Sequence, residues 1–301
     1  MSTEKKPYIP DGWETPTCPF CGSSQSSLYE RFGSSLQYTY VTCTNCELIY
    51  QSPRPIYNKH FIDAAYAEYY QYADNISMDD FNNIRESGVA MFKKEVDHLL
   101  KYDKRRTAAL DIGSGMGTFL YAAKPHFQEV LGLDVSEQMG SFVTKQLGVP
   151  VHITQFDDFN YSRKFSLIHM SHVLEHVPNP NEWVQKAKSM LEKDGILVIN
   201  IPNKRSISFR MQHLFVRLGI KKQFSNTWTD TSRTPDHLFE PTIPAMKYLV
   251  EKNGFDIIEY FTYSRKDPVS NQSAFSKLLN REMRWGSNLS FILTPKTTNE
   301  A

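Results

Sequence analysis

Short apolar runs alternate with amphipathic stretches along the chain from residue 107 onward. Short apolar runs are typical of buried strands, whereas apolar positions three and four residues apart indicate helices that face a core. Their alternation predicts an α/β fold, in which helices cover both faces of a parallel sheet. The predicted strands comprise residues 108–112, 130–133, 151–153, 165–170, 196–201, 255–261 and 289–293.

Helix signals fall between these runs. Asn179 is a predicted N-cap, Pro180 occupies the first turn, and the apolar stripe that follows ends at Gly195. The stripe consists of Trp183, Val184, Ala187, Met190 and Leu191. A second helix, ending at Gly254, points Met246, Leu249 and Val250 inward. A third opens at Asp79–Asp80 and has Phe81, Ile84, Met91, Phe92, Val96, Leu99 and Leu100 at helical spacing.

Residues 203–240 interrupt the alternation, and we expect them to form an inserted lid or an element that faces the substrate. Apolar Ile207, Phe209, Met211, Leu214, Phe215 and Leu218 interleave there with basic Arg205, Arg210, Arg217, Lys221 and Lys222. The pattern predicts either a basic amphipathic helix that rests on a membrane with a lipid-linked acceptor, or a lid helix with its basic face in water. The lid is favoured because charged faces are usually solvated.

All four cysteines lie near the N-terminus as two C-x2-C pairs: Cys18, Cys21, Cys43 and Cys46. Two such knuckles present four thiolates, which predicts a structural zinc site without an open coordination position. Disulfides are the alternative, but a reducing compartment opposes them, and a thioredoxin-like redox motif needs only one pair. The predicted organisation is therefore a flexible arm (1–17), a zinc-ribbon-like module (18–55), a helical connector (56–104) and a main domain (105–301).

Composition limits the partners. The chain has 34 Lys and Arg against 33 Asp and Glu, a net charge of +1, so no global field attracts a polyanion and a nucleic-acid partner is not expected. No apolar run is long enough to span a bilayer, and the first residues lack the apolar core of a signal peptide. We therefore expect a cytoplasmic protein. The oligomeric state is not predictable from these features.

A glycine-rich loop carries the main chemical signal. Gly113, Gly115 and Gly117 follow the first predicted strand, where backbone amides and a helix N-terminus converge on a ligand. The spacing departs from the G-x-G-x-x-G dinucleotide motif because the third glycine arrives one residue early. Asp134 ends the second strand, where its carboxylate can accept hydrogen bonds from both hydroxyls of a ribose. The pair predicts a nucleoside cofactor.

With these motifs, the chain resembles the class I S-adenosylmethionine (SAM) dependent methyltransferases. The resemblance rests on D-I-G-S-G-M-G at 111–117, L-D-V-S-E-Q-M at 133–139, F-S-L-I-H-M-S-H-V-L-E-H-V-P at 165–178, G-I-L-V-I at 195–199 and D-H-L-F at 236–239, and it spans residues 107–295. It implies a Rossmann-like seven-stranded methyltransferase sheet. The cysteine knuckles with a tyrosine-rich connector also resemble zinc-bearing members associated with glycan and deoxysugar modification.

The resemblance implies a cofactor site. Gly113, Gly115 and Gly117 would line the methionine and ribose portion of SAM, and Asp111 would orient that loop or receive the cofactor ammonium. Asp134 would bind the ribose.

The resemblance also implies contacts at the two ends of the cofactor. Val135 and Met139 would cover the adenine, while Gln155 stands where the family usually has an acidic residue and Phe156 would add backbone and ring contact. A shifted alignment would move that position to Asp157 or Asp158. Ser171 and His172 would border the methionine end and the entry of the methyl acceptor.

Methyl transfer to an alcohol requires that a proton leave the hydroxyl, and a histidine is the natural acceptor for it. His237, His172 and His176 are the candidate catalytic residues, and His237 ranks first because substrate-facing residues of the family tend to fall there. The alternative for each is a hydrogen-bonded structural histidine. Tyr69 or Tyr70 would complete the acceptor pocket; simple packing of the N-terminal module against the main domain is the alternative.

The leading hypothesis is an enzyme that O-methylates a sugar, nucleotide-linked or lipid-linked, or another small polar metabolite; C- or N-methylation is less favoured. RNA is the rival acceptor, since zinc ribbons can contact nucleic acid, but the stretch between the knuckles, 22–42, holds one basic residue, Arg31. A third hypothesis is a non-catalytic binding scaffold. Intact Gly113, Gly115, Gly117 and Asp134 argue against it.

Overall fold

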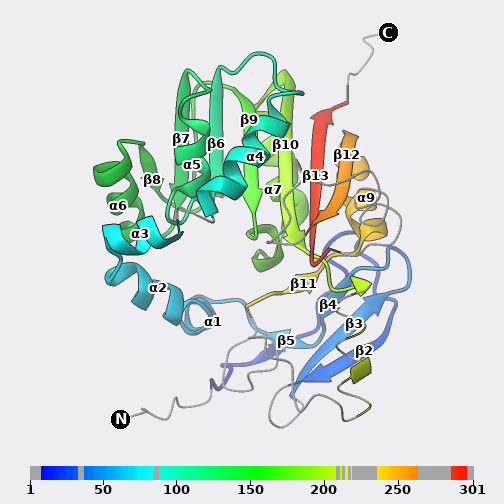
Figure 1. The fold of residues 1–301 in the computed structure, drawn as a ribbon. Helices are drawn as coiled ribbons and strands as arrows, with labels where there is room; N and C mark the ends of the chain where they lie inside the picture. Colours follow the sequence, from blue (N-terminus) through cyan, green and yellow to red (C-terminus); the bar gives the residue numbers. More distant parts are fainter. Residues whose placement is uncertain are drawn as a thin grey trace.

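A mixed seven-stranded sheet forms the centre of the protein in the computed structural model (Figure 1). The structure describes residues 8–32, 37–84, 88–207, 211, 214, 215, 218, 236–263 and 286–296. The strands are β6 (Ala108–Ile112), β7 (Glu129–Asp134), β8 (Val151–Ile153), β9 (Phe165–Ser171), β10 (Leu191–Pro202), β12 (Phe255–Tyr263) and β13 (Asn288–Pro295), in the order β12-β13-β10-β9-β6-β7-β8. The predicted α/β fold and its seven strands are confirmed. Only β13 runs antiparallel to its neighbours.

Helices cover both faces of this sheet because its strands are apolar on both sides. Alternate residues within a strand enter different cores: Ile196 and Val198 pack with α4 (Ala90–Leu99), α5 (Thr118–Ala123) and α6 (Glu137–Leu147). Leu197 and Ile199 instead pack with α7 (Pro180–Met190) and α9 (Ile243–Lys252). β6 lies between β7 and β9. The chain forms β7 and β8 on one side of β6, and then crosses to form β9 and β10 on the other side. Ligands bind at such a switch point, at the carboxyl ends of the strands.

Two helix predictions need correction. α7 ends at Met190, and Leu191 already pairs with Phe165 as the first residue of β10, so the apolar stripe does not extend to Gly195 as helix. Asn179 occupies the N-cap without a side-chain hydrogen bond. Sheet pairing overrides the helical spacing at Leu191 because it buries both the side chain and the backbone polar groups.

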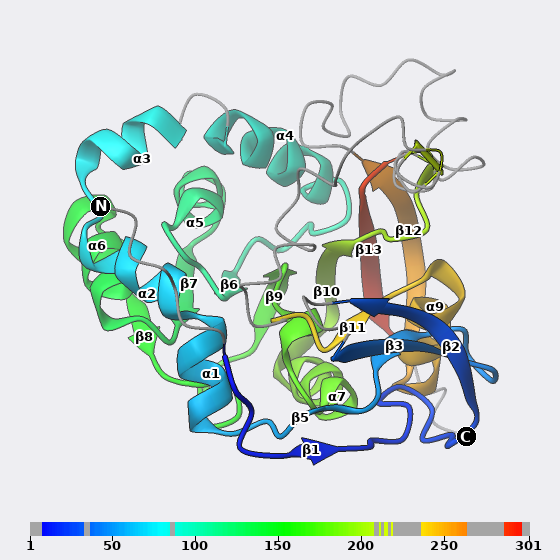
Figure 2. The ribbon, with the colours of Figure 1, turned by 90° about the horizontal axis from the view of Figure 1, so that it is seen from below.

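The predicted helix from Asp79 to Leu100 is divided into α3 (Met78–Ile84) and α4, with residues 85–87 outside the described part. The two helices have different partners: Phe81 packs against Tyr121 and Phe142, whereas Val96 enters the sheet core. Before them come α1 (Lys59–Ala65) and α2 (Ala67–Asp74), which lie below β7 and β8 in Figure 1 and in front of that end of the sheet in Figure 2.

The N-terminal module is built around a second sheet of four strands, in the order β11-β4-β3-β2. Its strands are β2 (Ser26–Phe32), β3 (Tyr38–Cys43), β4 (Ile49–Gln51) and β11 (Phe239–Glu240). β11 comes from the end of the expected insertion, so the module shares a sheet with the main part of the chain. The expected flexible arm contains a short strand, β1 (Trp13–Glu14), which pairs with β5 (Arg54–Pro55) at the end of the module. The carboxylate of Glu14 accepts a hydrogen bond from Arg54 Nε.

Most of the predicted insertion, 203–240, lies outside the described residues, including Arg210, Arg217, Lys221 and Lys222. The lid and the membrane-resting helix therefore both stay predictions, as does the cytoplasmic location. Among the residues that are described, no helix is long and apolar enough to cross a bilayer.

Candidate active site and metal centre

The glycine-rich loop turns at the carboxyl end of β6, with all three glycines at positive φ: Gly113 at 72°, Gly115 at 49° and Gly117 at 71°. A side chain at Gly113 would collide with Val173, and one at Gly117 would lie 2.8 Å from Val143. A side chain at Gly115 would meet nothing within 4 Å. The backbone of Gly115 therefore borders open space, into which a ligand can approach.

Asp134, at the carboxyl end of β7, anchors this loop. Its carboxylate accepts hydrogen bonds from the backbone N–H of Gly115 (2.8 Å) and of Ser136 (2.9 Å). Burial raises the pKa of Asp134, and these backbone hydrogen bonds act against that rise. Tyr69, on α2, also donates its hydroxyl to this carboxylate, 3.1 Å from Oδ1. Tyr69 thus lies where the resemblance places the hydroxyls of a ribose, and its role in an acceptor pocket stays a prediction.

The side chains expected around an adenine differ in exposure. Val135 is 43% exposed beside Asp134, whereas Met139 is completely buried in α6. Gln155 is exposed, but the ring of Phe156 is buried and lies 5.0 Å from that of Trp183. The contact with Trp183 takes Phe156 into the core, so its ring does not line an open pocket.

A shifted alignment would place Asp157 or Asp158 at the adenine position, and Trp183 contacts one of these two aspartates. Trp183 Nε1 donates a hydrogen bond to Asp157 (3.2 Å), and both Asp157 and Asp158 are exposed.

A buried polar network supports the glycine-rich loop from below. His169 Nδ1 lies 2.7 Å from Asp111 Oδ1, and its Nε2 lies 3.5 Å from Glu95 on α4. The His169 ring stacks on Phe119, with 3.9 Å between ring centroids. Burial opposes the charge on His169, but Asp111 and Glu95 raise its pKa to about 9. Asp111 is thus held beneath the loop, a position suited to orienting it.

A second polar cluster, here called the Glu-His cluster, consists of Glu175, His176, His237 and Glu240. Glu175 and His176 belong to the short helix η2 (Leu174–His176) after β9, and His237 and Glu240 come from the β11 segment. The rings of His176 and His237 lie edge to face, 4.6 Å apart. His237 Nδ1 lies 2.9 Å from Glu240 Oε1. The cluster thus joins residues far apart in the sequence.

The Glu-His cluster is strongly coupled electrostatically. Burial raises the pKa of Glu175, but the surrounding histidines lower it to about 2. Burial also lowers the pKa of His237, while Glu240 and Glu175 together raise it to about 9. The pKa of His176 falls because of burial and the adjacent charge of His237. Two buried carboxylates at one place make this cluster suited to cationic ligands.

The N-terminal module forms one wall of the Glu-His cluster. The backbone carbonyl of His237 accepts hydrogen bonds from Tyr40 (2.8 Å) and from Gln51 Nε2 (2.6 Å), on β3 and β4. Lys204 Nζ lies over the Tyr40 ring at 4.1 Å and 3.8 Å from Glu240. Burial lowers the pKa of Lys204. The module therefore fixes the position of His237.

Residues 171–173 connect the Glu-His cluster to the glycine-rich loop. Ser171 ends β9, and Val173 is the neighbour that leaves no room for a side chain at Gly113. Between them, His172 has a positive φ of 55°, an unusual conformation for a residue other than glycine. Its Nδ1 lies 3.3 Å from Glu175 Oε1. The three candidate catalytic histidines, His172, His176 and His237, therefore gather at one place, and Tyr66 lies against His176 with 5.7 Å between the rings.

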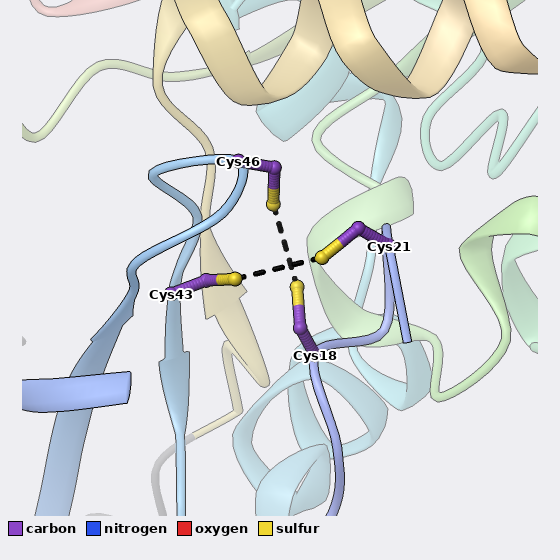
Figure 3. Close-up of side chains that lie close together, drawn as sticks. All are labelled: Cys18, Cys21, Cys43 and Cys46. Carbon is purple, nitrogen blue, oxygen red and sulfur yellow. Dashed lines mark hydrogen bonds between the residues drawn. The ribbon is translucent and has the colours of Figure 1, made fainter. Parts of the chain in front are cut away.

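The four cysteines converge in the N-terminal module (Figure 3). Their sulfur atoms all lie within 4.8 Å of one another, and the Cys18–Cys46 and Cys21–Cys43 sulfur pairs are each 3.5 Å apart. A disulfide would require about 2.05 Å. Four sulfurs around zinc, at about 2.3 Å from the ion, stand about 3.8 Å apart, so the arrangement fits a tetrahedral ion.

Sequence reasoning missed His169, Glu95, Glu175 and Glu240 as site residues. Glu175 lies within the L-E-H stretch on which the resemblance rests, and Glu240 lies three residues after His237. The spacing of Glu175 and Glu240 in the sequence does not mark either residue as part of a site. The two carboxylates come to the same cluster because β11 pairs with β4 in the module sheet.

Comparisons with known proteins agree with this geometry. A family model described as a methyltransferase domain matches residues 84–260. An uncharacterized protein of Methanocaldococcus jannaschii is 29% identical over 143 residues, 47% of this chain and 64% of that protein. A ubiquinone biosynthesis O-methyltransferase of Glaesserella parasuis is 29% identical over 114 residues, 34% of this chain and 48% of that enzyme. The chain thus matches between 48% and 64% of the length of these relatives.

One solved structure shows the shared fold. Magnesium protoporphyrin IX methyltransferase from Synechocystis PCC 6803, determined with bound S-adenosylhomocysteine (SAH), superposes with a TM-score of 0.51 at 13% identity. The superposition covers 76% of this chain and 99% of that one.

Proposed function

This chain belongs to the methyltransferase-domain family, and from that premise we propose that it transfers a methyl group from SAM to a hydroxyl of a sugar or another small polar metabolite. The observation that carries the proposal is the continuity of two sites. The glycine-rich loop and Asp134 form one, the Glu-His cluster forms the other, and residues 171–173 join them. A cofactor held at the first would present its reactive end to an acceptor at the second.

The residues at the first site fit SAM. The Asp134 carboxylate would accept hydrogen bonds from the ribose hydroxyls, which would replace the hydrogen bond that it accepts from the Tyr69 hydroxyl. The open side of Gly115 admits the cofactor to the backbone, and exposed Val135 and Gln155 would lie toward the adenine. Ser171 would border the methionine end. When bound, SAM supplies a methyl group on a positively charged sulfur.

The second site suits a hydroxyl acceptor. The new bond joins the acceptor oxygen to the methyl carbon while the carbon–sulfur bond breaks, and the hydroxyl proton passes to the protein. His237, His176 and His172 are the candidates to receive it, and positioning supplies much of the acceleration. Carboxylates, imidazoles and the Lys204 ammonium at one place offer the donors and acceptors that a polyol requires.

We also propose that Cys18, Cys21, Cys43 and Cys46 hold a structural zinc ion. Their sulfur geometry supports it, and four thiolates leave no position for a substrate. The ion would fix the knuckles against the main domain, in a part of the molecule where β4 pairs with β11.

The test is transfer of labelled methyl from SAM into a cell extract, with the product sorted by size and by ribonuclease treatment. We expect small or glycan-bound label that survives the nuclease. Asp134→Asn should lower methyl transfer at least tenfold, whereas exposed Asp256→Asn, on β12, should leave it unchanged. Label lost to ribonuclease would show an RNA acceptor instead. A protein that gives no heat in calorimetric titration with SAH would act as a scaffold.

A further inference from the structure

We propose that the Glu-His cluster binds a divalent transition-metal ion through Glu175, His176 and His237, in addition to the ion at the cysteines. In the described part of the chain, two groups of side chains bring metal-binding atoms together, the four cysteines and these three residues. One ligand atom from each of the three lies within 4.8 Å of the others. Two imidazoles and one carboxylate are a common protein site for zinc and for divalent iron.

Hydrogen bonds at Nδ1 orient the rings of both histidines. His176 Nδ1 lies 3.0 Å from the backbone carbonyl of Asp236, which can only accept, so that nitrogen carries the proton. His237 Nδ1 likewise faces the Glu240 carboxylate at 2.9 Å. Metal-binding histidines characteristically donate their other ring N–H to a carboxylate or a carbonyl, which orients the ring and strengthens the ligand. In the Glu-His cluster, His237 faces a carboxylate and His176 faces a backbone carbonyl in this way.

Glu175 places a buried carboxylate beside His176 and His237. Its side chain is 0% exposed, and among the described residues neither carboxylate oxygen has a hydrogen-bond partner. His172 Nδ1 approaches Oε1 to 3.3 Å but without hydrogen-bond geometry. Burying an unsatisfied carboxylate is costly, and a metal ion would provide its partner.

Hydrogen bonds connect the segments that carry the three ligands. Tyr40 and Gln51 donate to the backbone carbonyl of His237, and the N–H of Leu238 donates to the backbone carbonyl of Glu175. These hydrogen bonds tie the two ligand-bearing segments to each other and to the module. A preorganised set of three ligands supports metal binding without a large conformational change.

Three protein ligands leave at least one coordination position open. This part of the inference rests on the proposed function: an acceptor hydroxyl bound at the open position would lose its proton more readily because the ion stabilises the oxyanion. The acceptor class is then a hydroxyl compound that can coordinate a metal, such as a vicinal diol. With His176 and His237 as ligands, His172, which lies outside the ligand set, is the histidine left to receive the acceptor's proton.

Metal content tests the inference without any methyl-transfer assay. We expect two equivalents of metal per wild-type chain by elemental analysis after incubation with Zn²⁺ and dialysis, and one equivalent in Glu175→Gln and in His237→Asn. His126→Asn, at a half-exposed histidine between α5 and β7, is the matched control and should keep two. Glu240→Gln, which keeps all three ligands, should weaken binding at the second site about 10-fold to 100-fold.

Cobalt distinguishes the two sites. Co²⁺ at the cysteines gives sulfur-to-metal charge-transfer absorption, whereas Co²⁺ at the Glu-His cluster gives weaker visible bands, which Glu175→Gln should abolish. Retention of the cysteine-bound metal and the melting temperature report whether each variant is folded. One equivalent in folded wild type, or two in folded Glu175→Gln, would overturn the inference. Two equivalents without methyl transfer to any acceptor would instead count against the proposed function.

Discussion

At the scale of single residues, the contacts around the glycine-rich loop explain why particular residue types stand there. Asp111 is held by His169, and His169 is held in turn by Glu95 and by stacking on Phe119. Gly113 and Gly115 share a positive φ but not the same surroundings, since only Gly113 faces a close side chain. These contacts separate Gly113, where packing excludes a side chain, from Gly115, which borders open space.

The His169 network makes stability depend on pH. The pKa of His169 is raised from 6.5 to about 9 in the folded protein, so its contribution is fully present below pH 6.5 and is lost as the pH rises through 9. Between pH 6.5 and 9.5 we expect the free energy of unfolding to fall by about 3 kcal/mol more in wild type than in His169→Gln. Denaturant titrations at each pH measure this. Parallel curves would contradict it, and His126→Gln should follow wild type.

Gly113 and Gly115 form a matched pair for separating stability from ligand binding. Gly113→Ala adds overpacking against Val173 to the strain of a positive φ, which should lower the free energy of unfolding by about 2–4 kcal/mol. Gly115→Ala carries the φ strain alone, about 1–2 kcal/mol, but its methyl group enters the open side of the loop.

Thermal melting and SAH titration measure the two effects. Gly115→Ala should weaken SAH binding at least tenfold, and unchanged SAH affinity would show that the cofactor lies elsewhere.

At the scale of elements, the N-terminal module is attached to the main domain by strand pairing and by side chains of α7 and α9. β11 pairs with β4, and Thr242 at the N-cap of α9 donates a hydrogen bond to the backbone carbonyl of Glu47. Asn181 on α7 donates to the carbonyls of Pro19 and Phe20, inside the first cysteine knuckle. Secondary-structure elements of both parts thus form one continuous unit.

Asn181 tests this attachment. Asn181→Ala removes the side-chain donor of the Pro19 carbonyl, while the Phe20 carbonyl keeps its hydrogen bond from Lys252 Nζ, and we expect a loss of about 1–3 kcal/mol in the free energy of unfolding. Gln185→Ala, at an exposed position on the same helix, should change it by less than about 0.5 kcal/mol. Equal stability of the two variants, measured by denaturant unfolding, would show that the contact contributes nothing.

At the scale of the whole molecule, the two functional regions are coupled through the module. The proposed zinc ion would fix the knuckles, and β3 and β4 hold the backbone of His237. Residues 171–173 connect the Glu-His cluster with the glycine-rich loop. Loss of the proposed zinc ion should therefore disturb the proposed acceptor site, while the proposed cofactor site at β6 and β7 is retained.

Cys43→Ser tests this coupling. We expect a lower melting temperature, because structural zinc contributes folding energy, and at least tenfold lower methyl transfer with SAH affinity within twofold of wild type. Asn45→Ala, an exposed position in the same knuckle, is the control and should resemble wild type. Full metal loss with an unchanged melting profile would show that the ion has no structural role.

The sequence by itself determined the features that depend on neighbours along the chain. The strands near 108–112 and 165–170, the glycine-rich loop and the cysteine knuckles follow from local spacing, and the structure reproduces them. Local spacing also located three histidines at the carboxyl side of the sheet, although it could not show that they meet.

Only the tertiary structure decided where distant segments touch. It placed Leu191 in a strand, directed Phe156 into the core against Trp183, and brought Glu175 beside His237 through the pairing of β11 with β4. The physical reason is that burial and hydrogen bonding between residues far apart in the chain outweigh local preference, and no periodic pattern records which distant partner will satisfy a buried polar group.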